Sequence, residues 1–154
     1  MFPEALRIKL VASLVLPHVD HGGIAYTDIT AEQDRKLYRA VNNCIRFLYN
    51  IKADEHISPY YTRLRWLKIA VRRSYFIGCQ LYNILRTERP GFLYVEFNNR
   101  IFASERSTRA PGGTLVQPQC RTETYRRFFK ITAIRLWNSL SPSIRSANSL
   151  EVFK

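Results

Sequence analysis

The hydrophobic residues of this chain recur mostly at the spacing of an α-helix. Near the N-terminus, Leu6, Leu10 and Leu14 are four residues apart and therefore share one side of a helix. The pattern predicts a helix over residues 3–18 that bends or ends near Pro17. Proline has this effect because it lacks the backbone N–H that the helix needs and its ring obstructs the preceding turn.

A second helix is predicted by its first turn as well as by its apolar positions. Thr30 and Gln33 have the spacing of a capping box, in which each side chain accepts a hydrogen bond from the backbone N–H of the other residue. The helix should run to about residue 49, with an apolar side made of Leu37, Ala40, Val41, Cys44 and Leu48. Its opposite side carries Arg35, Arg39, Asn42 and Arg46. Such a stripe can lie along a phosphate backbone, and an ordinary solvated face explains it equally well.

Two further helices are predicted before the pattern breaks. Ser58 and Pro59 suit the N-cap and the first position of a short helix that ends near residue 65. A longer helix over 69–86 should bury Ile69, Ala70, Ile77, Leu81, Ile84 and Leu85, and carry Arg72, Tyr75, Tyr82 and Arg86 on its other side. Pro90 and Gly91 then interrupt the helical spacing. We place a domain boundary there, with a helical bundle over 1–89 and a smaller subdomain over 90–154.

The chain after the break shows a weaker pattern. Residues 98–113 are predicted to form a loop, and residues 115–118 and 120–125 two short strands. A helix over 132–140 should bury Ala133, Leu136, Trp137 and Leu140. Asn148 and Glu151 have the capping spacing of a last helix that lasts one turn, as expected of a fragment truncated at its end. The expected fold is mainly α, a helical bundle followed by a small α+β C-terminal subdomain.

The charge of the chain is large and unevenly distributed. The net charge is +12, and residues 1–62 carry 7 Lys/Arg against 7 Asp/Glu whereas residues 63–154 carry 17 against 5. A positive excess of this kind favours a polyanionic partner such as nucleic acid, because Lys and Arg displace counterions from phosphates. A basic surface without a specific partner is the alternative. The candidate nucleic-acid-binding residues are Arg35, Arg39, Arg46, Arg72, Arg73, Arg126, Arg127 and Lys130.

Aromatic residues are interleaved with the cations of residues 125–130. An exposed ring there could stack on an unpaired base while the cations bind phosphates. The alternative is that Phe128 and Phe129 belong to a core, which we expect of at least one of them. Trp66 and Trp137 are expected to be core residues rather than base-stacking platforms.

The sequence argues against several classes of site. Its three cysteines, Cys44, Cys79 and Cys120, are few and widely spaced, which favours a reducing compartment over a disulfide framework. His18 and His21 lack the second pair of ligands that a zinc site needs, so no metal or cofactor is expected. No apolar stretch approaches the roughly 20 residues of a membrane span. We therefore expect an intracellular, soluble protein, cytoplasmic or nuclear.

Several short motifs occur in an order that resembles one known family. They are residues 9–18 ending in Pro-His, His56-Ile57-Ser58-Pro59, Leu64-Arg65-Trp66-Leu67, Arg121-Thr122 with Tyr125, a Leu-Trp-Asn-Ser-Leu run over 136–140, Ile144-Arg145, and Ser149-Leu150 before Phe153-Lys154. Together they span nearly the whole chain and are similar to the thumb and C-terminal region of reverse transcriptases from jockey-like (LINE-type) non-LTR retrotransposons. Where that family often has Ser-Phe before the tryptophan motif, this chain has Phe128-Phe129.

The resemblance implies a function without catalysis in this part of the protein. The region it covers grips the template–primer duplex of an RNA-directed DNA polymerase and would work beside a fingers and palm domain. The family's catalytic aromatic-x-Asp-Asp turn, which holds the metal ions, has no counterpart because the chain contains no Asp-Asp pair. No polymerase activity is therefore expected of the chain by itself. The alternative is a stand-alone helical module that docks a protein partner through Tyr75 and Tyr82.

Overall fold

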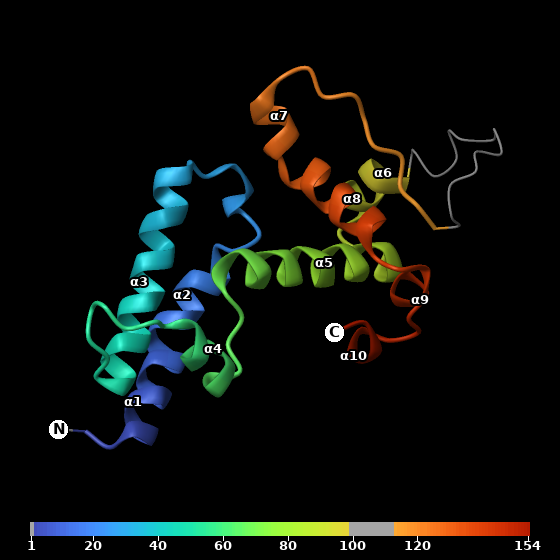
Figure 1. Ribbon diagram of the computed structural model, residues 1–154. Coiled ribbons are helices and arrows are strands. Elements are labelled where there is room, and N and C mark those ends of the chain that lie inside the picture. The colour runs from blue at the N-terminus through green and yellow to red at the C-terminus, as the bar shows by residue number, and fades with distance from the viewer. Residues whose placement is uncertain (1, 99–112) are drawn as a thin grey trace. The chain divides into compact units, whose positions relative to one another are not determined.

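The structure is a computed structural model that describes residues 2–98 and 113–154. Within these residues all regular secondary structure is helical (Figure 1). They fall into two compact units, one ending at Arg73 and the other beginning at Ser74. None of the described helices is both long enough and apolar enough to span a membrane. Because the regular secondary structure of the described residues is helical, the mainly α character predicted from the hydrophobic spacing is confirmed.

The N-terminal helical segment continues past the proline at which the sequence predicted a bend or end. It consists of α1 (Glu4–Leu10), a π-helical turn η1 (Val11–Val15) and α2 (Leu16–His21). The Leu16 N–H donates to the Val11 carbonyl, so the backbone is wound more widely just before Pro17. Pro17 then lies in the first turn of α2, where its missing N–H costs little.

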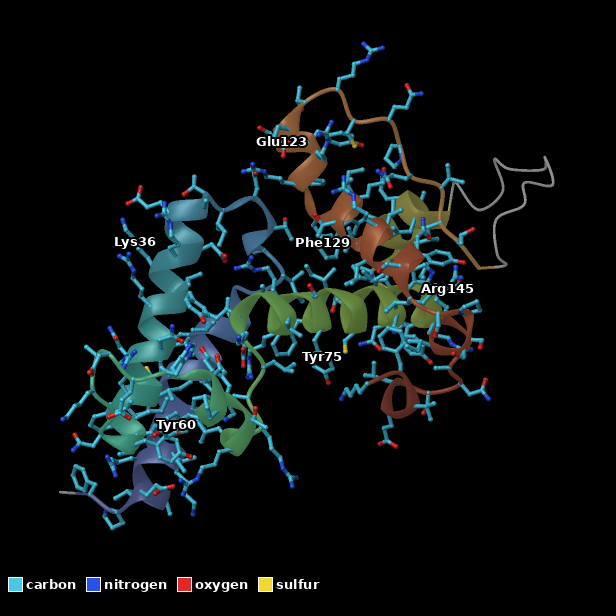
Figure 2. The ribbon with its side chains drawn as sticks, viewed as in Figure 1. Lys36, Tyr60, Tyr75, Glu123, Phe129 and Arg145 are labelled. Carbon is cyan, nitrogen blue, oxygen red and sulfur yellow. The ribbon has the colours of Figure 1, made fainter. Side chains whose placement is uncertain are left out.

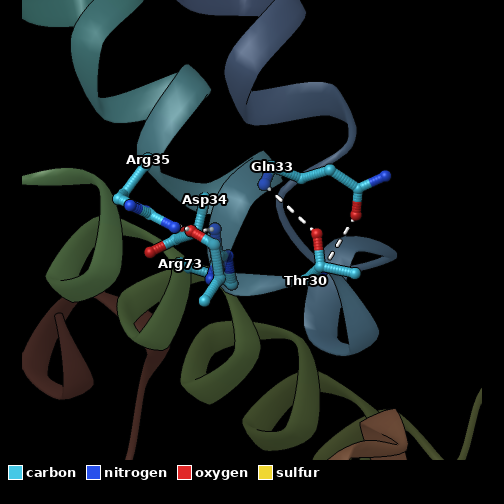
Figure 3. Close-up of polar contacts among 6 residues, drawn as sticks. Thr30, Gln33, Asp34, Arg35 and Arg73 are labelled. Atoms are coloured by element: carbon cyan, nitrogen blue, oxygen red, sulfur yellow. Dashed lines mark hydrogen bonds and ion pairs between the residues drawn. The ribbon is translucent and has the colours of Figure 1, made fainter.

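Helix α3 (Ala31–Tyr49) follows a short 3₁₀ turn η2 (Tyr26–Asp28) and confirms the predicted capping box. The Gln33 N–H donates to Thr30 Oγ1 at 3.2 Å, and the Thr30 N–H donates to Gln33 Oε1 at 2.9 Å (Figure 3). The core side differs in one member from the prediction, because Ala40 is exposed and Ile45 is fully buried beside Val41 and Leu48.

The first unit is completed by α4 (Ser58–Leu64) and the start of α5 (Ile69–Thr87). The predicted N-cap of α4 is wrong by one residue, since Ile57 occupies the cap position and makes no side-chain cap bond. Ile57 is instead buried in the core of the unit, together with Val41, Ile45, Tyr61 and Ile69. Trp66 packs against this cluster, as expected of a core residue.

Helix α5 has the predicted extent, but its two sides differ from the prediction in places. Ala70 is exposed, whereas Tyr82 is only 3% exposed and donates its hydroxyl to the Ala147 carbonyl at 2.8 Å. Tyr82 therefore belongs to the core of the second unit and does not share an exposed stripe with Tyr75. The domain boundary predicted at 89/90 lies shortly after the end of α5 at Thr87, and the two units divide within α5, between Arg73 and Ser74.

The second unit contains five helices after α5 within the described residues. They are α6 (Gly91–Asn98), α7 (Glu123–Arg127), α8 (Phe129–Ser139), α9 (Pro142–Arg145) and α10 (Leu150–Phe153). The predicted helix over 132–140 is confirmed, although it begins earlier, at Phe129. The last helix has the predicted single turn, with Ser149 rather than Asn148 as its N-cap. The loop predicted over 98–113 lies almost entirely outside the described residues.

The two predicted strands are wrong, and with them the α+β subdomain. Leu115 does not pair with another strand in the described structure. Its N–H donates to Asn138 Oδ1 at 2.9 Å, and its carbonyl accepts from Asn138 Nδ2 at 2.8 Å. Farther along, Thr122 Oγ1 accepts from the Tyr125 N–H at 3.2 Å and so caps α7 where a strand was expected. A side-chain amide and a helix cap thus satisfy the backbone groups that a sheet would otherwise pair.

The core of the second unit is built around Trp137, which is 6% exposed. Its indole N–H donates to the Gly113 carbonyl at 2.9 Å, and its ring stacks on that of Phe153 with 6.0 Å between centroids. The buried partners include Ile77, Leu81, Tyr82, Ile84, Phe97, Leu115, Ala133, Ile134 and Ala147. Trp137 is a core residue, as predicted.

Candidate nucleic-acid interface

The eight cations predicted to bind nucleic acid differ sharply in how they are engaged. Arg46 lies on the predicted stripe of α3, but its guanidinium donates to the carbonyl of Lys52 and, at 3.2 Å, to the carbonyl of Glu55. Asn50 ends α3 in the left-handed conformation, and the loop after it folds back beneath these donors. Arg46 therefore holds the loop that follows α3, a contact that the helical wheel does not reveal.

Arg72 and Arg73 are each paired with an acidic residue of the first unit. The Arg72 guanidinium makes a two-bond fork with the Asp20 carboxylate, in which Nη2 lies 2.6 Å from Oδ2. The hydrogen bonds that Arg72 donates to Asp20 raise the pKa of Arg72, so this guanidinium stays charged. Arg73 Nη2 donates to Asp34 Oδ1 at 2.7 Å (Figure 3). The side chains of Arg72 and Arg73 are only 22% and 18% exposed, and the two pairs tie the start of α5 to α2 and α3 within the first unit.

The three candidate cations of the second unit are also close to carboxylates. Lys130 forms an ion pair with Glu96, and only 14% of its side chain is exposed. Arg126 and Arg127 share the carboxylate of Glu123, at 3.2 Å each, and remain about half exposed. Lys130 therefore links α8 to α6, whereas the two arginines remain accessible to solvent.

Arg35 and Arg39 are the candidates that remain open. Both are exposed on α3, and neither has a carboxylate partner among residues 2–98 and 113–154. The Arg35 Nε–H donates only to the Ala31 carbonyl of its own helix, at 3.3 Å. Together with Glu32 and Lys36, these two arginines line one open hollow on the helix surface.

Lys36 is a member of this surface that the sequence-based set omitted. It projects from α3 into solvent (Figure 2) and pairs with Glu32 at 3.1 Å, one helical turn earlier. Both side chains are about 70% exposed, so the ion pair is weak. Lys36 can therefore easily exchange the Glu32 carboxylate for another anion. The signal that could have identified Lys36 is its position three residues before Arg39, which places the two on neighbouring positions of one helix face. We call Arg35, Lys36 and Arg39 the α3 cation face.

The described residues show no arrangement typical of a metal site or of an activated thiol nucleophile. They contain no group of three or more His, Cys, Asp and Glu side chains placed to hold a metal ion. The three cysteines are free thiols. Burial raises the pKa of the Cys44 thiol, which disfavours the nucleophilic thiolate. The α3 cation face therefore remains the candidate site, and its chemistry is the binding of anions.

Comparisons with models of protein families, with curated proteins and with solved structures find no match to this chain.

Proposed function

We propose that the chain is a non-catalytic part of the reverse transcriptase of a non-LTR retrotransposon and that it grips the template–primer duplex through the α3 cation face. In this proposal the fingers and palm domain of the polymerase is a partner that supplies the catalytic metal site. The observation that supports this proposal is the α3 cation face. It places three exposed cations on one helix, with Glu32 as the single carboxylate among them.

The geometry of α3 suits a phosphate backbone. Arg35 and Arg39 are one turn apart, which is about 6 Å along a helix axis at 1.5 Å per residue. Side chains at that spacing can reach successive phosphates of one strand, while guanidinium groups offer donors in a fixed fork. The opposite side of α3 is buried in the core of its unit through Val41, Ile45 and Leu48, so the helix is a rigid support for these contacts.

The residues that carry the family resemblance near the C-terminus support a structural role for that region. Trp137 lies in the core of the second unit, and the Asn138 side chain binds both backbone polar groups of Leu115. Their place in the sequence motif is thus accounted for by packing and hydrogen bonding. This agrees with a region that positions nucleic acid rather than one that performs the chemistry.

Salt-dependent binding tests the grip. The variant Arg35→Gln/Lys36→Gln/Arg39→Gln is titrated against a labelled RNA–DNA hybrid duplex at several salt concentrations, with fluorescence anisotropy as the readout. Each lost phosphate contact should lower the slope of log affinity against log salt by about 0.9. The matched control, Lys9→Gln/Lys52→Gln/Lys68→Gln, removes the same charge from exposed positions of the same unit outside α3. Equal slopes for the two triple variants would contradict a specific role for α3.

The assignment to a reverse transcriptase is tested separately from the grip. The nucleotide sequence in frame before the codon for Met1 should encode a palm with an aromatic-x-Asp-Asp turn. An unrelated domain encoded there would contradict the assignment while leaving the binding result intact. Docking of a protein partner through Tyr75 and Tyr82 is less favoured, because Tyr82 is buried within the second unit.

A further inference from the structure

Two aromatic rings lie exposed side by side at the end of α7. The rings of Tyr125 and Phe128 have centroids 6.4 Å apart and planes within 17° of parallel. Tyr125 is 38% exposed and Phe128 is 56% exposed. The next residue, Phe129, packs against the core of the second unit and meets Phe97 edge to face. Core packing therefore accounts for Phe129, as expected for one of the two phenylalanines, but leaves the Tyr125–Phe128 pair without a role.

The local backbone holds these rings in place. Thr122 caps α7 by accepting from the Tyr125 N–H, and the Phe128 N–H donates to the Tyr125 carbonyl at 3.2 Å. Phe128 itself is extended, with φ −56° and ψ 145°, so the helix is broken between α7 and α8. Its carbonyl then accepts from the N–H groups of Ile131 and Thr132, both at 3.0 Å. The break turns Phe128 towards Tyr125 and Phe129 towards the core.

Three arginines lie close to the rings in the sequence. Arg121, Arg126 and Arg127 are all exposed, and Glu123 is the carboxylate that the last two share. Three guanidinium groups against one carboxylate leave an excess of positive charge at the surface. Ion pairs of this exposure contribute little to stability, and each guanidinium keeps donors that Glu123 does not use. A phosphate can therefore bind these arginines without a large loss of stabilisation from their ion pairs with Glu123.

We propose that this ring–arginine surface, comprising Tyr125, Phe128, Arg121, Arg126 and Arg127, binds unpaired nucleotides of a single-stranded nucleic acid. A single strand offers flat base faces together with regularly spaced phosphates, which match rings beside arginines. A duplex hides its base faces in the stack, and an acidic peptide offers charge without such faces. The site lies on a different unit and takes a different form of nucleic acid from the α3 cation face, so either proposal can fail without the other.

Binding of a labelled 12-nucleotide oligouridine, compared with a blunt duplex, tests the site. Tyr125→Ala and Phe128→Ala should each weaken single-strand binding by about 5- to 150-fold, the range found for a lost base–aromatic stack. Neither change should alter binding to the blunt duplex. Phe92→Ala is the matched control, because Phe92 is 71% exposed in the same unit and should leave both affinities unchanged. Replacing Arg126 and Arg127 with Gln should lower the salt slope of single-strand binding by about 0.7 per contact.

Conservative changes at Phe128 separate stacking from simple hydrophobic contact. Phe128→Trp keeps a stacking face and should bind oligouridine at least as well as the wild type, whereas Phe128→Leu should bind as weakly as Phe128→Ala. Wild-type affinity in the Leu variant would overturn the proposal, as would unchanged binding in the two Ala variants. Equal competition by polyglutamate would show a site for acidic peptides instead. When Phe128→Ala is added to the α3 triple variant, it should weaken single-strand binding by the same factor as it does in the wild type.

Discussion

Replacement of Trp137 by Ala should destabilise the second unit severely. The side chain is almost fully buried, stacks on Phe153 and donates its indole N–H to the Gly113 carbonyl. Loss of a buried large aromatic costs about 3–5 kcal/mol, because the neighbours collapse only partly into the space that it leaves. The hydrogen bond adds about 1 kcal/mol, since the Gly113 carbonyl loses a partner. The total approaches the whole stability of a small domain, which is about 5–15 kcal/mol.

Urea unfolding followed by circular dichroism measures this loss, and limited proteolysis locates it. Cleavage should accelerate first in residues 113–154, the part of the chain that Trp137 anchors. Trp137→Phe is the graded control, because it keeps a ring against Phe153 but loses the N–H, and it should cost about 1–2 kcal/mol. Phe92→Ala, at an exposed position, should stay within about 0.5 kcal/mol of the wild type. A loss below about 1 kcal/mol in Trp137→Ala would refute the assignment of Trp137 as the core residue.

Three further changes have expected outcomes. Burial raises the pKa of Tyr61 to about 12, so the stability that this neutral phenol contributes is complete below pH 10 and is lost as the pH rises towards 12. In urea titrations Tyr61→Phe, which loses the hydrogen bond to Asn42, should be less stable than the wild type by about 1 kcal/mol at pH 7, level with it between about pH 10 and 11, and more stable than it near pH 12. Arg46→Gln should cost about 1–2 kcal/mol in the same assay and leave the salt slope of duplex binding unchanged, because its guanidinium binds the Lys52 and Glu55 carbonyls; a changed slope with intact stability would contradict this role. The purified chain should show no Mg²⁺-dependent primer extension, and measurable extension would overturn the non-catalytic assignment.

The sequence failed where local patterns carry no information about distant partners. Helix α6 was not predicted, because its apolar residues surround the helix without a preferred side and give no helical spacing. The pattern before α7 predicts strands, although Thr122 with a first-turn Glu123 is also a helix start. Helical spacing alone predicts an exposed position for Tyr82, whereas its buried hydroxyl donates to the distant Ala147 carbonyl. The position of Lys36 on the cation face becomes evident only from the structure.

The sequence alone determined the elements whose signals lie within one or two helical turns. The capping box and the periodic apolar side of α3, and the long apolar side of α5, are of this kind, because backbone geometry and propensity act over a few residues. Only the tertiary structure decided which cations are available. Arg72 meets Asp20, 52 residues away, and Lys130 meets Glu96, 34 residues away, whereas Arg35 and Arg39 meet no carboxylate within the described residues. Charge pairing depends on distance in space, which a linear pattern of residues does not contain.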